Sequence, residues 1–189
     1  MIGSHNSMSY LTPRRWYLRP FKFMSRCQSK TLKEQYEKYG VRLFDLRISF
    51  DKNGTPYFAH GLMQYKGDVY TYLEYLDGKA DVDVRLLLEE GFDDGDNFQE
   101  SHFKAFCIKV KSKYKNIRFF GGIRKRDWTV IHDFKYKGPV FKDLYSSMQP
   151  PKYDDLWPYW YAKHNNKKNI EKFGDNDDYY LLMDFVHIR

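Results

Sequence analysis

Residues 40–47 of the chain read Gly-Val-Arg-Leu-Phe-Asp-Leu-Arg, and this stretch is the clearest β-strand in the sequence. Side chains alternate between the two faces of a strand, so Asp45 and Arg47 share one face. The apolar residues Phe44 and Leu46 share the opposite face. The sequence therefore places two charged groups together on one side of a predicted sheet.

A hairpin is expected directly after this strand, which we place over residues 41–50. Residues 51–54, Asp-Lys-Asn-Gly, carry the Asn-Gly signal of a tight turn, and residues 57–60 are expected to form the returning strand. Before it, residues 29–39 are predicted to form a helix, with Ser29 as its N-cap and Gly40 ending it.

Further strands alternate with helical patterns along the rest of the chain. Strands are predicted over residues 2–5, 82–89, 117–122, 128–134 and 179–186. Helices are predicted over residues 69–76, 97–114 and 163–173, the last after an irregular loop over residues 149–161. This alternation predicts an α/β fold, and the element order suits a (β/α) barrel of TIM-barrel type. Such barrels typically have about 200 residues or more, so this one is expected to be small, distorted or incomplete.

The bulk composition is that of a globular protein. The chain has 189 residues, 42% of them hydrophobic and 30% charged, which predicts one domain over residues 1–189. It contains neither a long apolar run nor a signal-peptide pattern, so we expect it either to stay in the cytoplasm where it is made or to be a mature form. The net charge of +7 favours an anionic partner, such as phosphate groups, nucleic acid or acidic lipid.

Two cysteines, Cys27 and Cys107, lie far apart in the sequence and lack the spacing of metal ligands. The sequence therefore predicts two ordinary thiols, without a disulfide framework or a zinc site.

Two histidines are expected at the ends of strands. Residues 3–7 read Gly-Ser-His-Asn-Ser and place His5 at the end of the first strand, where barrel strands deliver catalytic groups. His60 ends the strand that returns from the hairpin and is followed by Gly61. We expect both histidines to converge with Asp45 and Arg47.

These elements together resemble the catalytic X region of the phosphatidylinositol-specific phospholipase C family, particularly its bacterial metal-independent members. The matching features are the His5-Asn6 step, the Gly-x-Arg-x-Phe-Asp-x-Arg strand of residues 40–47 and the His60-Gly61 step. The resemblance implies a distorted barrel. It also implies cleavage of a phosphodiester by a neighbouring hydroxyl through a cyclic phosphate, with a phospholipid or inositol phosphate head group as substrate and no nucleic acid partner.

Such a reaction needs one group to take a proton from the attacking hydroxyl and another to protonate the leaving oxygen, and imidazole suits both near neutral pH. A guanidinium such as that of Arg47 stabilises the charge on the phosphoryl oxygens. The resemblance implies that His5 is the general base, His60 the general acid and Asp45 an orienting carboxylate. Asp184, on the last predicted strand, is expected to fix the tautomer of His5.

Asn6 differs from the metal-independent pattern, which usually has aspartate there, and is more like the calcium-dependent relatives. Those enzymes also use carboxylates on the second strand and at a position that resembles Glu89. Here Arg47 replaces one such carboxylate, so we predict no metal, with calcium as the alternative. Asn6, Glu89 and Arg124, from the basic run that follows Gly121-Gly122, are the predicted substrate-binding residues.

Residues 12–24 mix basic and aromatic side chains, and they are interpreted either as a lipid-contact loop or as a solvated loop packed under the barrel. Their two prolines make a regular amphipathic helix unfavourable.

Two other functions remain open. A short barrel suits a catalytically inactive binding or structural module. A metal-dependent glycerophosphodiesterase-like enzyme would keep the phosphodiester chemistry, but Arg47 interrupts the carboxylate pair expected on its second strand. The sequence leaves the oligomeric state undetermined.

Overall fold

The computed structural model describes residues 1–89, 97–123, 140–143, 157–174 and 179–189. The predicted strand at 128–134, Arg124 and most of the predicted loop at 149–161 lie outside these residues. Within them, no helix is long and apolar enough to cross a membrane.

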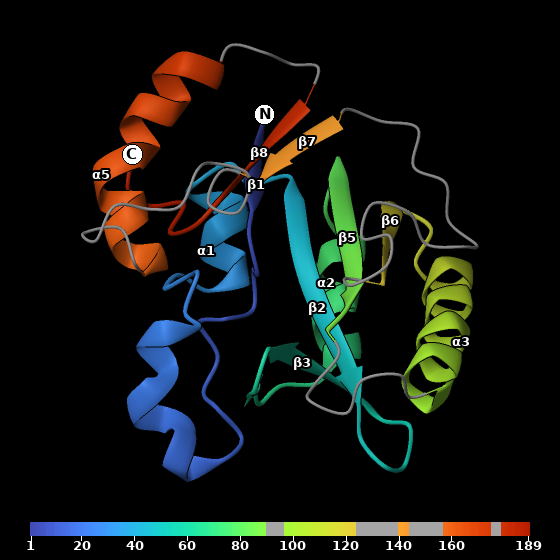
Figure 1. Cartoon of the computed structure of the whole chain (residues 1–189). Helices are drawn as coiled ribbons and strands as arrows, with labels where there is room; N and C mark the ends of the chain where they lie inside the picture. The colour runs from blue at the N-terminus through green and yellow to red at the C-terminus, as the bar shows by residue number, and fades with distance from the viewer. Residues whose placement is uncertain (90–96, 124–139, 144–156, 175–178) are drawn as a thin grey trace.

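The fold is mixed α/β and is built on one largely parallel sheet (Figure 1). Among the described residues, six parallel strands follow the order β7 (Val140–Asp143), β8 (Tyr179–Met183), β1 (Ile2–Ser4), β2 (Leu43–Phe50), β5 (Val82–Leu88) and β6 (Ile117–Ile123). Within the described residues β6 and β7 are not paired, so the sheet is open there. The fold is therefore an incomplete barrel at most.

Two antiparallel strands extend this sheet. The strand β3 (Pro56–His60) pairs with β2, and β4 (Met63–Gln64) pairs with β3. The turn from β2 to β3 forms where it was predicted, because the N–H of Gly54 donates to the carbonyl oxygen of Asp51 at 2.8 Å. The Asp51 carboxylate also accepts hydrogen bonds from the N–H groups of Asn53 and Thr55 at 2.9 and 3.0 Å, which stabilises the turn.

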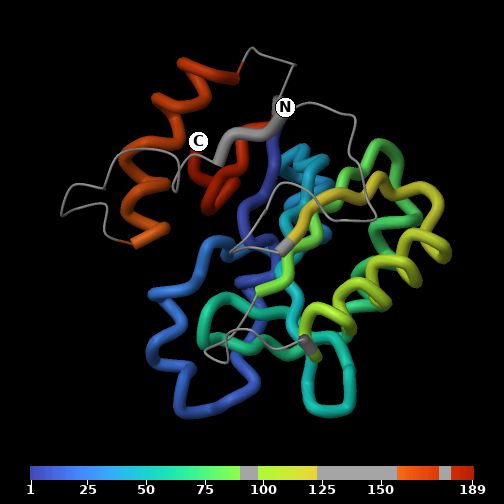
Figure 2. Tube along the Cα trace, turned by 45° about the vertical axis from the view of Figure 1, so that its right-hand side comes forward, coloured from blue at the N-terminus to red at the C-terminus, as the bar shows by residue number. Residues whose placement is uncertain are grey.

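Within the described residues, helical segments accompany the sheet (Figure 2). They are η1 (Trp16–Met24), α1 (Leu32–Glu37), α2 (Val69–Asp77), α3 (Asn97–Lys113) and α5 (Pro158–Phe173).

Two predicted helix starts were wrong. The N-cap of α1 is Thr31 instead of Ser29, because the Thr31 hydroxyl and the Glu34 carboxylate form a reciprocal capping box. Helix α5 begins at Pro158, inside the predicted loop, because proline suits the first turn of a helix, where no N–H donor is needed.

Segment η1 also differs from the predicted loop, since it is a 3₁₀ helix of nine residues. Pro20 lies inside it, and the fixed φ of proline is compatible with 3₁₀ geometry.

The alternation predicted for β2 decides which residues enter the core. Phe44, Leu46 and Ile48 are fully buried in the main hydrophobic cluster, together with residues of α2 and α3. Burial of each such side chain contributes roughly 1.5–3 kcal/mol. Leu43, on the opposite face, belongs to a smaller cluster with residues of β6 and β8. Asp45 shares that opposite face and is therefore buried on the inner side of the curved sheet.

The strands β1 and β3 lie along the same edge of β2 and run toward each other. Ser4 in β1 is paired with Phe44, and Phe58 in β3 is paired with Ile48. His5 comes directly after Ser4, and His60 comes two residues after Phe58. Because the two strands run toward each other, the two histidines meet beside the middle of β2. This head-to-head arrangement positions the candidate site.

Candidate active site

His5 is bound on one side by Asp184. Its Nδ1 atom lies 2.7 Å from Oδ1 of Asp184, and both residues are buried. Asp184 directly follows β8, which is the neighbour of β1 in the sheet. The parallel pairing of β1 and β8 brings the two side chains to the same end of adjacent strands.

The other nitrogen of His5 contacts Arg47. Its Nε2 atom lies 2.5 Å from Nη2 of Arg47. A guanidinium has only donors, so Nε2 must be the acceptor and must carry a lone pair. The proton of a neutral imidazole is then on Nδ1, where it is donated to Asp184. The hydrogen-bond network thus selects the tautomer in which Nε2 is a base.

Two carboxylates hold the Arg47 guanidinium. Its Nε donates to Oδ2 of Asp45 at 3.2 Å, and its Nη1 donates to Oε2 of Glu89 at 3.4 Å. Asp45 also accepts a hydrogen bond from the backbone N–H of Asn6 at 3.0 Å. The guanidinium therefore stands between Asp45 and Glu89, in the space that a cation bound by both would need.

Asp45 has a second basic neighbour that the sequence analysis missed. Arg85, on β5, is paired with Asp45 across the sheet, is 1% exposed and has its Nε 3.7 Å from Oδ1 of Asp45. Burial alone would raise the pKa of Asp45, but the charges of Arg85 and Arg47 outweigh it and hold this pKa well below its usual range. The signal in the sequence was the pair of charges, Asp83 and Arg85, that interrupts the apolar run at 82–88 and shares one face of the strand.

His60 faces His5 across the site. The centres of the two rings lie 6.4 Å apart, and the Nδ1 atom of His60 lies 2.9 Å from the carbonyl oxygen of Ser25, which therefore accepts a hydrogen bond from it. Burial, with a further contribution from Arg47, lowers the pKa of His60 to about 4. His60 is therefore neutral at neutral pH when no ligand is bound.

Gly61 links His60 to the rest of the site. It begins the turn between β3 and β4 with a φ of +54°, a conformation that glycine adopts without strain. Its N–H donates to Oε1 of Glu89 at 2.7 Å. Glu89 thus contacts Arg47 with one oxygen and orients the end of β3 with the other.

Gln28 is a structural residue of the site that the sequence analysis also missed. Its side-chain amide donates to the carbonyl oxygens of His5 and Met183 at 3.1 and 2.8 Å, while its carbonyl accepts from the N–H of Val186. Gln28 therefore ties the ends of β1 and β8 together. A glutamine in a loop carries no sequence signal for such a role.

Of the predicted substrate-binding residues, Asn6 and Glu89 lie at the site, and Arg124 lies outside the described residues. The Asn6 side chain is 1% exposed, and its Nδ2 has no hydrogen-bond partner among the described residues. A buried amide donor without a partner is costly, so this atom suits an acceptor supplied by a ligand.

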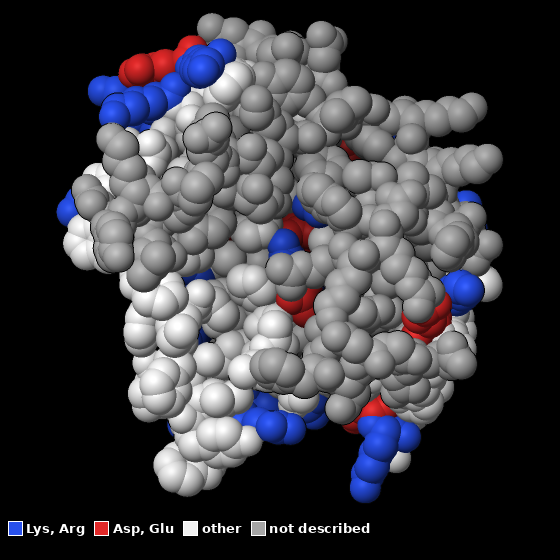
Figure 3. All heavy atoms as spheres, in the orientation of Figure 1, with Lys and Arg blue, Asp and Glu red and all other residues white. Residues whose placement is uncertain are grey.

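An exposed apolar surface lies on η1. None of its residues is buried, and Trp16, Phe21 and Phe23 are 75%, 53% and 54% exposed. In Figure 3 this corner of the molecule, at the lower left, is mainly uncharged and has basic atoms beside it. Segment η1 lies in the connection that begins with His5 directly after β1, so the surface belongs to the same end of the sheet.

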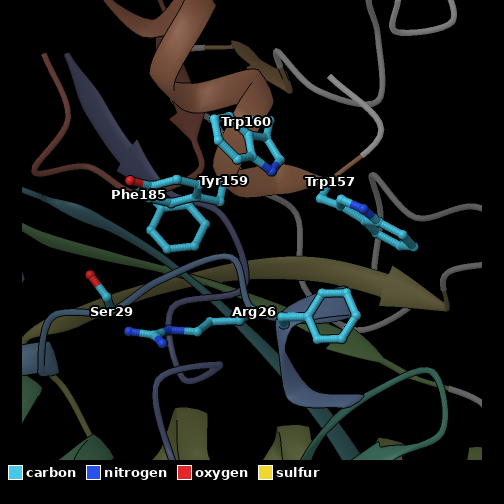
Figure 4. A pocket seen from close by; sticks show the side chains of 7 residues that line it. Arg26, Ser29, Trp157, Tyr159, Trp160 and Phe185 are labelled. Atoms are coloured by element: carbon cyan, nitrogen blue, oxygen red, sulfur yellow. The ribbon is translucent and has the colours of Figure 1, made fainter. Parts of the chain in front are cut away.

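A pocket of about 260 Å³ adjoins this surface (Figure 4). It is lined by aromatic side chains from three parts of the chain, with two polar residues among them: Phe23, Arg26, Ser29, Trp157, Tyr159, Trp160 and Phe185. The pocket shares Phe23 with η1, so the two apolar surfaces are continuous.

No protein-family model and no curated protein sequence matches the chain. Its structure resembles those of bacterial phosphatidylinositol-specific phospholipases C. The enzyme from Listeria monocytogenes has a TM-score of 0.63 and 15% identity, over 98% of this chain and 87% of that one. The H258Y mutant of the Staphylococcus aureus enzyme gives the same TM-score and identity, over 98% and 84% of the two chains. At this identity, the likeness establishes the fold alone.

Proposed function

We propose that this chain cleaves the phosphodiester of a phosphatidylinositol-type lipid, by attack of a neighbouring hydroxyl on phosphorus and through a cyclic phosphate. The observation that carries the proposal is the bonding of His5. The Nδ1–H of His5 donates a hydrogen bond to Asp184 and the Arg47 guanidinium contacts Nε2, so a basic lone pair lies directly beside a fixed cation.

In the proposed reaction, Nε2 of His5 takes the proton of the attacking hydroxyl. The phosphoryl oxygens accept hydrogen bonds from Arg47, which stabilises the charge that develops on them. The amide of Asn6 offers a further donor. Asp45 and Glu89 hold the guanidinium in place, so little reorganisation is needed when substrate binds.

His60 is the proposed general acid, and its low pKa sets a condition on that role. Burial and Arg47 disfavour the imidazolium while the site is empty. A bound phosphodiester brings a negative charge that offsets Arg47 and raises the pKa of His60. His60 therefore takes up a proton as substrate binds and delivers it to the leaving oxygen.

A lipid substrate is favoured by the surroundings of the site. The exposed aromatic residues of η1, the aromatic pocket beside it and the net charge of +7 suit an anionic bilayer surface. Another similar structure, of the S. aureus enzyme, concerns the modulation of its membrane binding, with a TM-score of 0.59 and 16% identity over 98% of this chain and 85% of that one. We extend peripheral membrane binding to this chain as part of the proposal.

The calcium-dependent alternatives place a cation between carboxylates. Here the Arg47 guanidinium fills that position between Asp45 and Glu89 and would repel a divalent ion bound there. The residues present therefore do not fit calcium, and the proposed reaction has no step that uses it.

The test is release of a cyclic inositol phosphate from phosphatidylinositol vesicles in the presence of a chelator. The native chain is compared with His5→Ala and His60→Ala, and the control is His164→Ala on the exposed face of α5. We expect chelator-resistant release that is lost in the first two variants and kept in the third. Absence of release with calcium restored would contradict the proposal.

A further inference from the structure

A buried thiol lies beside the catalytic pair described above. Ligand atoms of His5, Cys27 and Asp184 all lie within 4.8 Å of one another. The three residues are 6%, 0% and 3% exposed. The proposed phosphodiester chemistry has no use for this thiol, and the sequence spacing did not indicate that it would meet the other two residues.

The backbone fixes Cys27 in this position. Its N–H donates to Oγ of Ser9 at 3.0 Å, and its carbonyl accepts from the N–H of Phe185 at 2.6 Å. Phe185 is the residue after Asp184, so this backbone hydrogen bond positions the Cys27 thiol beside the Asp184 carboxylate. The thiol itself lies 3.7 Å from the Ser25 carbonyl oxygen and is positioned to donate to it.

We propose that His5, Cys27 and Asp184 form a binding site for a thiophilic divalent cation of the Zn²⁺ class, and that an occupied site is inhibited. The inhibition rests on the proposed function, whereas the binding does not.

The three groups match zinc in type and in spacing. Imidazole, thiolate and carboxylate are the ligands of Zn²⁺, with bonds of about 2.0–2.3 Å. Tetrahedral ligands at such distances lie roughly 3.3–3.7 Å apart. The His5 and Asp184 atoms are now 2.7 Å apart and all three lie within 4.8 Å, so shifts on the order of 1 Å are enough. A sulfur and a nitrogen ligand disfavour Ca²⁺ and Mg²⁺.

Each proton that is displaced when the metal binds can be accounted for. The thiol of Cys27 releases its proton to solvent, and the imidazole of His5 stays neutral as its single proton moves from Nδ1 to Nε2. The carboxylate of Asp184 and the new thiolate then neutralise the two charges of the ion. A fourth coordination position is left for water.

This change of tautomer explains the inhibition. The nitrogen on the Asp184 side, Nδ1, becomes the metal ligand, so Nε2 carries the proton and loses its basic lone pair. That N–H also faces the donor Nη2 of Arg47, which is 2.5 Å away, and two donors cannot form a hydrogen bond. The basic form of His5 and the metal-bound form therefore exclude each other.

The test is a titration of the metal-free chain with Co²⁺, which reports a thiolate ligand by its charge-transfer absorption, followed by displacement with Zn²⁺. The native chain and Cys107→Ser, which removes the other buried cysteine, should both show the band. The band should be absent in Cys27→Ser. In Arg47→Met the band should appear at lower metal concentration, because the donor opposing Nε2–H is gone.

A second measurement needs no variant of Cys27. X-ray absorption of the native chain loaded with one equivalent of Zn²⁺ should show one sulfur and otherwise nitrogen or oxygen ligands. A shell without sulfur, or a cobalt band that survives Cys27→Ser and disappears in Cys107→Ser, would overturn the proposal.

A measurement of activity distinguishes a failure of this proposal from a failure of the proposed function. If the chain turns over phosphatidylinositol, Zn²⁺ should abolish release of the cyclic inositol phosphate, and a chelator should restore it. Ca²⁺ should not inhibit the release. Turnover that Zn²⁺ leaves unchanged overturns the inhibitory site alone. A cobalt band without turnover of any phosphodiester leaves the metal site standing and contradicts the proposed function.

Discussion

His5 and Asp184 stand at opposite ends of the chain, 179 residues apart, and yet Nδ1 of the one lies 2.7 Å from Oδ1 of the other. The contact exists because β1 and β8 are paired in parallel, with Ser4 opposite Met183, so the residues after each strand are neighbours. Both the tautomer of His5 and its proposed role as a base depend on this contact.

Replacement of Asp184 by asparagine tests the tautomer directly. An amide in place of the carboxylate can donate to Nδ1, which moves the imidazole proton to Nε2 and removes the base. By analogy with hydrolases in which a carboxylate holds a catalytic histidine, we expect kcat to fall by roughly a hundredfold or more. Steady-state kinetics on phosphatidylinositol measures this, with the exposed Glu171→Gln on α5 as control. An unchanged kcat would contradict the role of Asp184.

Arg47→Lys tests the need for a forked cation. One ammonium cannot contact His5, Asp45 and Glu89 with the geometry of the guanidinium, although it keeps the charge. We expect kcat/KM to fall by about 10²–10³, the effect of losing one such transition-state contact. The matched control is Arg42→Lys, just before the same strand, where the guanidinium contacts backbone carbonyls away from the site. Equal losses in both variants would show a structural effect only.

The pKa of His60 offers a test without substrate. Burial and the Arg47 charge lower this pKa to about 4, so removal of the charge in Arg47→Met should raise it. An NMR titration of the imidazole C–H signals measures the shift. Inorganic phosphate or a soluble phosphodiester should raise the same pKa in the native chain. If neither the Arg47→Met substitution nor the added phosphate changes the pKa of His60, its role as general acid has no support.

The same residue predicts loss of stability in acid. The pKa of His60 is about 4 when folded and 6.5 when unfolded, so protons bind the unfolded state first as pH falls. The free energy of unfolding should therefore decrease between pH 6.5 and 4, by at most about 3 kcal/mol at 1.36 kcal/mol per pKa unit. The pKa of Asp45 is lowered in the folded protein, so Asp45 adds a further loss of stability once the pH falls below the usual pKa of an aspartate. Urea unfolding across this pH range measures the loss, and His60→Gln should show a smaller slope between pH 6.5 and 4.

Segment η1 predicts a separation of membrane binding from chemistry. Trp16→Ala combined with Phe21→Ala should weaken binding to anionic vesicles by at least about tenfold, because a tenfold change is about 1.4 kcal/mol and each apolar side chain contributes about 1.5–3 kcal/mol when fully buried. Turnover of a soluble, short-chain substrate should stay unchanged. Ile108→Ala removes a side chain on α3 that is 58% exposed and provides the control. A loss of vesicle binding equal to that in the control would rule out η1 as the contact surface.

Much of the local structure followed from the sequence because its determinants are local. The alternation in residues 41–50 predicted which side chains of β2 enter the core, and Phe44, Leu46 and Ile48 are buried there. The errors arose where a side chain competed with the backbone pattern. Thr31 with Glu34 moved the start of α1, and Pro158 moved the start of α5.

The candidate site divides in the same way. His5 and Arg47 were identified because their residue types suit phosphodiester chemistry. His5 also lies at the end of a predicted strand, and Arg47 shares one face of another predicted strand with Asp45. Arg85 and Gln28 were missed, since a buried cation and a bridging amide are determined by partners that are remote in sequence. Cys27 was interpreted as an ordinary thiol because ligand spacing was measured along the chain, and the fold places it beside His5 and Asp184.

The sequence by itself determined the strand with Asp45 and Arg47 on one face, the two histidines at strand ends and the mixed α/β fold. Only the tertiary structure decided that β1 and β3 approach head to head along β2, that Asp184 reaches His5 and that Arg47 stands between Asp45 and Glu89. The physical reason is that side-chain periodicity depends on neighbours two to four residues apart. Tautomer, pKa and metal affinity depend instead on distances between groups that only the pairing of strands brings together.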